Sequence, residues 1–466
     1  MKSTAELILP AIRWDPRNGF EPAKQAVEEA LALGVGGFII FGGEKEAVRK
    51  LTDDLAAAAP HPLLIASDLE RGAGQQVRGL TSLPPLMALA RLGEDVVREA
   101  ARITAREARD VGINWVFAPV VDLDIEPANP IVQTRSFGDD PGRVGALARA
   151  WIESCQAEGA LACAKHFPGH GRTTSDSHAE LPVVAADRAS LEADLGPFRD
   201  AIAAGVASVM TAHVAYPALD PSGVPATYSA RILTELLRRE MGYDGLVVTD
   251  ALIMKGALQQ TTEAEGAVRA LAAGCDLLLY PKDVAGVVAA IDAAIDAGTL
   301  PASHLTEAVA RRRAAAGRAR SAAGSEAKPP APSPMARDSL LVLRGAVQRL
   351  RGPLSVHVVD DDVGLPVPLP PRSAFTNALK ERGIEIGPGG ERVVILFADV
   401  KAGKKSGMLK PFIVHQLEAH LATPATVVLF GHPRHAARIP GEQPVLCAWS
   451  GDEVMQRAAA HFLLDA

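Results

Sequence analysis

The sequence has few cysteines, no long apolar run and no basic excess, and each absence excludes a class of protein. Four cysteines occur in 466 residues, scattered at positions 155, 163, 275 and 447 without CxxC spacing. This pattern is typical of thiols in a reducing compartment. No apolar stretch approaches the ~18 residues of a membrane-spanning helix, and Glu6 interrupts the short apolar start. We therefore expect a cytoplasmic protein with no signal peptide and no membrane association.

The charge balance argues against nucleic acid as a partner. Lys and Arg number 48 against 55 Asp and Glu, which gives a formal net charge of −7 at pH 7. Binding to nucleic acid or to an anionic membrane needs a basic surface that this composition does not favour. The apolar fraction of 48% is that of a globular protein with a sizeable core. A small neutral or anionic substrate is the expected partner.

Short apolar runs alternate with helical stretches over the first two thirds of the chain, which is typical of βα units around a parallel sheet. Eight runs can be counted, at residues 7–10, 37–41, 63–68, 114–121, 161–166, 208–213, 246–250 and 276–280. Eight units favour a (β/α)8 TIM-type barrel. An open doubly wound sheet would usually carry a Gly-rich phosphate-binding turn after its first strand, and none is present there.

A change in composition marks the end of this domain. Residues 321–334 are rich in Pro, Ala and Ser and contain no bulky apolar side chain, as expected of a linker. We therefore predict an α/β protein with a barrel domain at 1–318, a linker at 319–335 and a smaller C-terminal α/β sandwich domain at 336–466. The second domain is expected to have strands at 339–343, 354–359, 392–397 and 425–430 and helices at 373–382 and 412–422. It contains no residue that its sequence marks as catalytic.

Ionisable side chains follow five successive predicted strands. Barrel enzymes place reacting groups at the C-terminal ends of their strands, so these residues are the first candidates for a site. They are Asp68, Asp122 with Asp124, Lys165 with His166, His213, and Asp250. Any one of them could simply meet solvent, but together they predict a polar site on one rim.

The densest group of such residues is the loop 165–178, Lys-His-Phe-Pro-Gly-His-Gly-Arg-Thr-Thr-Ser-Asp-Ser-His. Metal ligation by His166, His170, His178 and Asp176 is one interpretation. The spacing of the first two histidines would suit a helix, but the Phe-Pro-Gly between them cannot continue one. We favour acid/base chemistry and expect neither a metal nor a cofactor.

Asp176 and His178 are two residues apart, and such positions project to the same side of an extended segment. A hydrogen bond between them would hold the imidazole in one tautomer and raise its basicity. In the alternative, both side chains bond the backbone of an ordinary loop. Asp250 ends an apolar strand abruptly and can act as a nucleophile. Retaining glycosidases need a nucleophile and a second group that protonates the leaving oxygen and later deprotonates water.

These segments make the sequence similar to glycoside hydrolase family 3, and within it to the β-N-acetylhexosaminidases of bacterial cell-wall recycling. That subgroup carries the signature Lys-His-Phe-Pro-Gly-His-Gly-x4-Asp-Ser-His-x2-Leu-Pro, which residues 165–182 match at every defined position. The resemblance also covers Asp68-Leu-Glu70, Arg135-Ser-Phe-Gly138, Met210-Thr-Ala-His213 and Thr249-Asp250. It implies removal of terminal β-linked N-acetylglucosamine from cell-wall muropeptides through a covalent glycosyl-enzyme.

The resemblance further implies that Asp250 is the nucleophile, His178 the acid/base and Asp176 its partner; should His178 not serve, Glu70 is the next candidate. Binding of the sugar is implied for Asp68, Arg135, Lys165 and His166, and less directly for Arg78 and His213. The segment 71–78 departs from the family's Glu-Gly-Gly-x-x-x-Arg, so either Arg71 or Arg78 could face the sugar. His213 could instead be structural, and His170 is expected to shape the loop.

Two other functions stay open at this point. A phosphorylase would use the same residues, since a neutral histidine acid/base repels an attacking phosphate less than a carboxylate does. A non-catalytic sugar-binding protein would keep the barrel without turnover, although both reactive residues are present.

Overall fold

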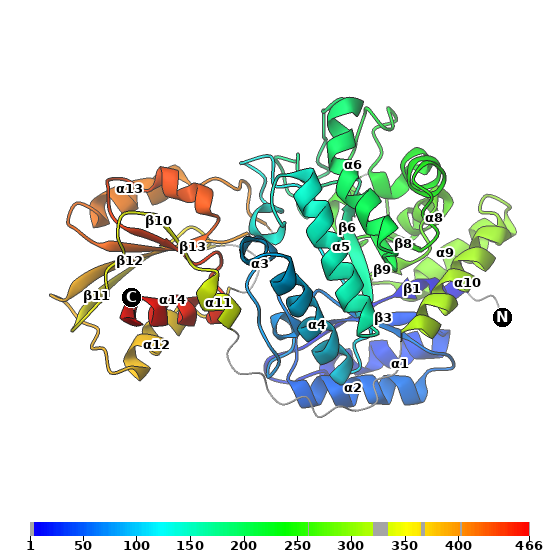
Figure 1. The fold of residues 1–466 in the computed structure, drawn as a ribbon. Coiled ribbons are helices and arrows are strands. Elements are labelled where there is room, and N and C mark those ends of the chain that lie inside the picture. Colours follow the sequence, from blue (N-terminus) through cyan, green and yellow to red (C-terminus); the bar gives the residue numbers. More distant parts are fainter. Residues whose placement is uncertain (1–3, 260, 320–333, 365–368, 401–402, 466) are drawn as a thin grey trace.

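The computed structural model describes residues 4–259, 261–319, 334–364, 369–400 and 403–465, which form a larger N-terminal and a smaller C-terminal domain (Figure 1). The larger domain contains a seven-stranded parallel sheet in the order β2-β3-β4-β5-β6-β7-β8. Its strands are β2 (Ala11–Arg13), β3 (Gly37–Phe41), β4 (Leu64–Ser67), β5 (Trp115–Val116), β6 (Leu161–Phe167), β7 (Ser208–Thr211) and β8 (Leu246–Val248). A further parallel pair joins β1 (Ile8–Leu9) to β9 (Leu278–Leu279). Each of the eight predicted apolar runs therefore contains a strand.

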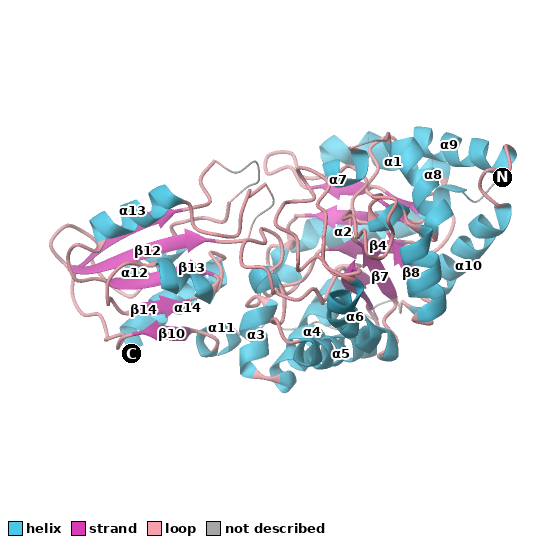
Figure 2. Cartoon of the chain, turned by 90° about the horizontal axis from the view of Figure 1, so that it is seen from above, coloured by secondary structure: helices cyan, strands magenta, loops and turns pink. Residues whose placement is uncertain are grey.

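The seven-stranded sheet is curled and has helices around its outside (Figure 2). The principal helices of this domain are α1 (Lys24–Leu33), α2 (Lys45–Ala58), α3 (Leu86–Leu92), α4 (Glu94–Asp110), α5 (Pro141–Ala157), α6 (Arg188–Ala203), α8 (Glu263–Ala273), α9 (Val284–Asp296) and α10 (Ala302–Arg318). Helix α4 shows how the sequence directs this packing, because its buried residues Val97, Ala101, Thr104 and Ala108 recur every three or four positions. Such spacing gives one apolar stripe that faces the sheet. Strands β3 to β8 are almost wholly buried on both faces, as expected for a parallel sheet covered by helices.

The smaller domain is built on a five-stranded sheet in the order β10-β14-β13-β12-β11. Its strands are β10 (Leu341–Arg344), β11 (Leu354–Asp360), β12 (Glu391–Ala398), β13 (Thr426–Gly431) and β14 (Val445–Cys447), and the β10–β14 pairing is antiparallel. Helix α13 (Pro411–His420) lies on one face, and α12 (Ala374–Glu381) and α14 (Glu453–Asp465) lie on the other (Figure 1). The four predicted strands and two predicted helices are present, whereas β14 and α14 were not predicted. Most of the predicted linker lies outside the described residues.

Polar contacts join the two domains. Asp124 of the larger domain accepts from Arg434, and its Oδ2 lies 2.9 Å from His432 Nε2. Arg71 makes an ion pair with Asp452 on the opposite side of the interface. Two arginine–carboxylate ion pairs and one histidine–carboxylate contact therefore link the domains at the rim where the strands of the curled sheet end.

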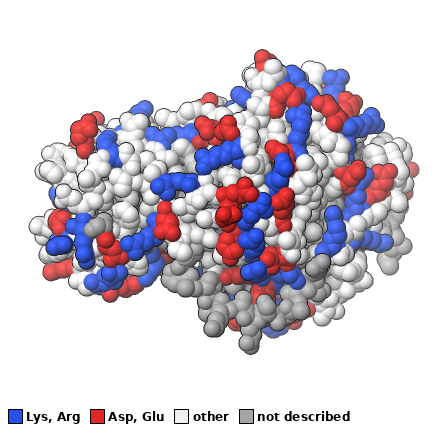
Figure 3. Space-filling view, viewed as in Figure 1, with Lys and Arg blue, Asp and Glu red and all other residues white. Residues whose placement is uncertain are grey.

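The surface carries both signs of charge intermixed over the face seen in Figure 3, in agreement with the modest net charge. Among the described residues, no helix is both long and apolar enough to cross a membrane.

A buried arginine fastens α10 to the start of the chain. The Arg312 side chain is 0% exposed and donates from Nη2 to the Gly36 carbonyl at 2.6 Å. Its Nη1 lies 3.4 Å from Glu6 Oε2, and Arg313 binds the same carboxylate from the solvent side. Burial of this guanidinium is tolerated because Nη1 and Nη2 both find partners.

Replacing Arg312 with Met should lower the free energy of unfolding by about 3 kcal/mol, because it removes the buried donor to the Gly36 and Pro62 carbonyls and weakens the pairing of Glu6. Arg313→Met is the matched control, since that side chain is 59% exposed and pairs with the same carboxylate. Its loss should cost much less, because solvent screens an exposed ion pair. Urea unfolding followed by circular dichroism measures the free energy of unfolding of both variants. Equal losses would contradict the larger contribution that we assign to the buried Arg312.

Candidate active site

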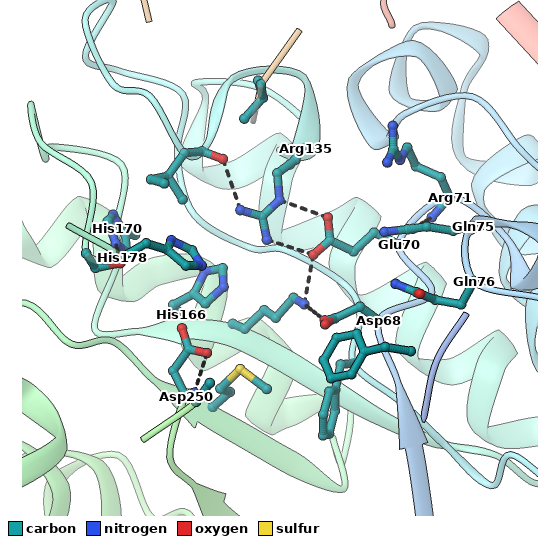
Figure 4. A pocket seen from close by; sticks show the side chains of 18 of the residues that line it. Asp68, Glu70, Arg71, Gln75, Gln76, Arg135, His166, His170, His178 and Asp250 are labelled. Carbon is teal, nitrogen blue, oxygen red and sulfur yellow. Dashed lines mark hydrogen bonds and ion pairs between the residues drawn. The ribbon is translucent and has the colours of Figure 1, made fainter. Parts of the chain in front are cut away.

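A cavity of about 340 Å³ opens where the strands of the curled sheet end (Figure 4). Six of the predicted site residues line it: Asp68, Arg135, Lys165, His166, His178 and Asp250. Three residues of the second domain also line it, namely Asp399, Val400 and Ser450. The carboxyl ends of neighbouring parallel strands meet at one rim, so residues separated by nearly 200 positions reach the same space.

The cavity floor is a chain of buried ion pairs centred on Glu70 (Figure 4). Lys165 Nζ lies 2.8 Å from Glu70 Oε1 and 2.7 Å from Asp68 Oδ1. Arg135 binds both oxygens of Glu70, with Nε and Nη2 at 2.9 and 2.8 Å. Burial alone would raise the pKa of Glu70, but Arg135 and Lys165 outweigh it and hold that pKa well below its usual value. Glu70 is therefore held as a carboxylate, which argues against the sequence-based suggestion that it could replace His178 as acid/base.

Lys165 and His166 are consecutive in β6, yet both face the cavity. The pairing of β6 with β7 shifts register between Lys165 and Phe167, and such an irregularity redirects side chains that would otherwise point to opposite faces. Asp122 fixes the imidazole from behind, with its Oδ2 2.7 Å from His166 Nδ1. The Nε2 edge of His166 is left for the cavity.

Asp250 follows β8, and its Oδ1 accepts a hydrogen bond of 2.7 Å from the Ala251 N–H. Burial would raise the pKa of Asp250, but His166, His213 and His178 together lower it to about 2. Asp250 is thus ionised at neutral pH, as a nucleophile must be. His213 is fully buried behind it, with Nδ1 2.8 Å from Thr227 Oγ1 and Nε2 3.2 Å from the Ala251 carbonyl oxygen. It supports the Asp250 turn and does not line the cavity.

Asp176 and His178 form the hydrogen-bonded pair that their spacing predicts. His178 Nδ1 lies 2.8 Å from Asp176 Oδ1, which also accepts from the His178 backbone N–H. The Asp176 side chain is 2% exposed and that of His178 46%. Burial lowers the pKa of His178, but the hydrogen bond and charge of Asp176 outweigh it and leave that pKa above its usual value. The imidazole is therefore able to hold a proton near neutral pH and to present Nε2 to the cavity.

His170 shapes the loop that carries this pair. Its Nδ1 lies 2.8 Å from Thr173 Oγ1 and its Nε2 3.2 Å from Ser177 Oγ. Burial and the neighbouring His166 lower the pKa of His170 to about 4, so it stays neutral. Among the described residues, no group of three or more His, Cys, Asp or Glu is arranged to hold a metal ion.

The two arginines of the segment 71–78 have different surroundings. Arg78 lies on the surface, 59% exposed, with its Nε 2.6 Å from Glu44 Oε1. Arg71 lines the cavity. A short 3-10 turn (Ala73–Gln75) lies between them. After this turn the chain leaves the cavity, and the Arg78 backbone forms a parallel bridge with Glu44. Arg71, and not Arg78, therefore lies at the cavity, and binding of the sugar by an arginine of this segment stays a prediction.

Sequence reasoning missed part of the cavity wall. Gln75 and Gln76 line it from the same turn, and Asp399 and Ser450 line it from the second domain. Neither glutamine is part of a motif, and the second-domain residues reach the cavity only through the docking of the two domains, which leaves no periodic signal in the sequence.

Comparison with known proteins shows the relatives of this chain. The model of the glycosyl hydrolase family 3 N terminal domain matches residues 3–313. A beta-N-acetylglucosaminidase/beta-glucosidase of Cellulomonas fimi is 38% identical over 290 residues, which are 60% of this chain and 51% of that relative. A beta-hexosaminidase of Nitrosomonas eutropha is 36% identical over 261 residues, 53% of this chain and 74% of the relative. The match thus spans about half the length of the Cellulomonas protein and about three quarters of the Nitrosomonas protein.

A solved structure is similar over the whole chain. The glycoside hydrolase family 3 beta-N-acetylglucosaminidase from Paenibacillus sp. str. FPU-7 superposes with a TM-score of 0.87 at 30% sequence identity, covering 100% of this chain and 96% of that one. Both domains and their connection order are therefore shared with that structure.

The His178 imidazole should titrate above the usual histidine pKa, because the Asp176 carboxylate stabilises its protonated form. Asp176→Asn removes that charge, so the His178 pKa should fall below its value in the unmodified protein. Nuclear magnetic resonance of histidine-labelled protein between pH 5 and 9 measures this. His170, buried and neutral, should not titrate in that window and serves as an internal control. An unchanged His178 pKa in Asp176→Asn would contradict the pairing.

Proposed function

Since the chain belongs to glycosyl hydrolase family 3, we propose that it is a retaining β-N-acetylhexosaminidase that removes terminal β-linked N-acetylglucosamine. One observation carries the mechanism: an ionised carboxylate, Asp250, and a carboxylate-supported imidazole, His178, line the same cavity. A nucleophile and a separate proton donor are the two groups that a retaining mechanism needs. The names of the Nitrosomonas and Paenibacillus relatives support the N-acetylglucosamine substrate.

In the first step, the Asp250 carboxylate attacks the anomeric carbon while protonated His178 gives its proton to the glycosidic oxygen. The bond between the anomeric carbon and that oxygen breaks, and the aglycone leaves as an alcohol. Asp176 stabilises the imidazolium before transfer and keeps Nδ1 protonated, so that Nε2 is the atom that gives the proton.

In the second step, neutral His178 takes a proton from water as the water oxygen attacks the anomeric carbon of the glycosyl-enzyme. The sugar leaves with retained configuration and the Asp250 carboxylate is restored. His178 is then protonated again, so the pair is ready for the next substrate.

The ion-paired floor is suited to hold the sugar hydroxyls. Asp68 accepts from Lys165, and a second carboxylate oxygen is left for a hydroxyl donor. We propose that Asp68, Lys165, Arg135 and His166 bind the hydroxyls, because all four side chains line the cavity and are held by buried partners. We propose that Arg71, which lines the cavity, contacts the sugar in place of Arg78.

The proposal includes the architecture of the domains. We propose that the curled sheet closes as a (β/α)8-type barrel over residues 1–318, joined by a linker at 319–335 to a domain at 336–466. Two pairings support closure, since Val248 at the end of β8 bridges Leu277 before β9, and β9 pairs with β1. Pro10 separates β1 from β2 because it has no N–H to give to a ladder. The cytoplasmic location and the muropeptide substrate stay predictions of the sequence.

The substrate proposal is tested with p-nitrophenyl glycosides. The kcat/KM for the N-acetyl-β-glucosaminide should exceed that for the β-glucoside about tenfold or more, the order of effect that one well-placed polar contact gives. Added phosphate should leave free N-acetylglucosamine as the product. Equal rates on the two sugars would contradict acetamido selectivity, and formation of the sugar 1-phosphate would establish a phosphorylase instead.

Asp250→Asn should lower kcat on the order of 10^3-fold or more, because the amide cannot form the glycosyl-enzyme. The fold should be kept, since the Ala251 N–H can still donate to the amide oxygen. In the unmodified protein, a 2-fluoro sugar with a good leaving group should label Asp250, which peptide mass spectrometry detects. A label on any other residue would refute the nucleophile assignment.

A further inference from the structure

The second domain reaches the acid/base pair through one backbone group. Asp176 uses Oδ1 for His178, and its Oδ2 accepts a hydrogen bond of 2.6 Å from the Gly403 N–H. Gly403 begins the segment 403–410, which follows β12 and precedes α13 and which we call the strap. An N–H donated to a carboxylate is a charge-assisted hydrogen bond, stronger than a neutral one. Both oxygens of the buried Asp176 carboxylate are thereby fixed.

The strap is anchored in its own domain by a buried lysine. Lys404 is 3% exposed, and its Nζ lies 2.7 Å from Asp361 Oδ2 and 3.1 Å from Asp362 Oδ1, both on fully buried side chains. At the far end, Lys410 Nζ donates to the Asp361 carbonyl at 2.6 Å. A buried charge is expensive to displace from its partners, so these contacts hold the strap in one place.

The strap also docks on the N-terminal domain. The Gly407 N–H donates to the Ala128 carbonyl at 2.8 Å, and Gln133 Nε2 donates to the Gly407 carbonyl at 3.2 Å. A Cβ atom at Gly407 would lie 2.3 Å from both the Asn129 carbonyl oxygen and Gln133 Nε2, so no larger residue fits without movement. Asn129 in turn donates to the His170 carbonyl at 2.8 Å, within the loop 165–178.

We propose that the strap is a positioning element for the acid/base, so that His178 is correctly aimed only when the second domain is docked. The inference rests on the proposed function, because it assigns a role through His178. Carboxylate torsions are soft, and without the Gly403 donor Asp176 can turn away from the imidazole. His178 is half exposed and has little packing of its own to hold it.

The test compares the full-length variants Gly407→Ala and His178→Ala on two substrates. N,N′-diacetylchitobiose has a poor leaving group that needs protonation, and 2,4-dinitrophenyl N-acetyl-β-glucosaminide has a good one that does not. His178→Ala should lower kcat/KM far more on the first substrate. Gly407→Ala should show the same selective loss, on the order of tenfold in the ratio of the two values. In the His178→Ala background, Gly407→Ala should leave that ratio unchanged.

Gly387→Ala is the matched control, because it adds a methyl group in the same domain where no atom lies within 4 Å of the new Cβ. This variant should leave kcat/KM unchanged for both substrates. If Gly407→Ala does not fold by circular dichroism, Lys410→Ala loosens the partly exposed end of the strap and should give the same selectivity.

The outcomes separate the two proposals. Equal losses on both substrates in the strap variant that folds, or no loss, would overturn the positioning role while a selective His178→Ala leaves the proposed function intact. A His178→Ala variant without leaving-group selectivity would overturn the acid/base assignment, and the strap proposal with it.

Discussion

The charge of the buried Glu70 carboxylate has to be balanced, and the geometry of the cavity floor follows from that requirement. An unpaired carboxylate at this depth would cost several kcal/mol, so cations from two other segments must reach it. Arg135 arrives from the loop after β5 and Lys165 from β6. Lys165 also forms an ion pair with Asp68. Three segments of the chain are thus fixed relative to one another before any sugar binds, which is the condition for a preorganised site.

The two proposed reacting groups are held in different ways. Asp250 lies on the rigid side of the cavity, at the end of a buried strand and backed by His213. His178 lies on a loop and is half exposed. A group that both gives and takes a proton has to meet first the aglycone and then water, so some exposure is useful to it. The Gly403 contact gives this exposed group a fixed support without enclosing it.

Features carried by local pattern could be predicted from the sequence, whereas features that depend on the path of a loop could not. Apolar runs indicated every strand of the larger domain except β2, and the i, i+2 spacing indicated the Asp176–His178 bond. The choice between Arg71 and Arg78 depended on a turn whose direction no periodicity encodes. The contact of Gly403 is made by a backbone N–H, and every residue except proline has one. The Gly403 N–H differs from others only in its position, beside the carboxylate of Asp176.

The three histidines of the signature loop show why a motif does not by itself assign roles. His166 is fixed by Asp122 and faces the cavity, and His170 is buried between two hydroxyl groups and stays neutral. His178 alone pairs with a carboxylate in a place that solvent can reach. The residue type is the same at all three positions, so the difference in chemistry comes from burial and partners. In this loop, most signature residues shape and anchor the segment, and their combined effect is to bring one histidine to the cavity with its Nδ1 already occupied.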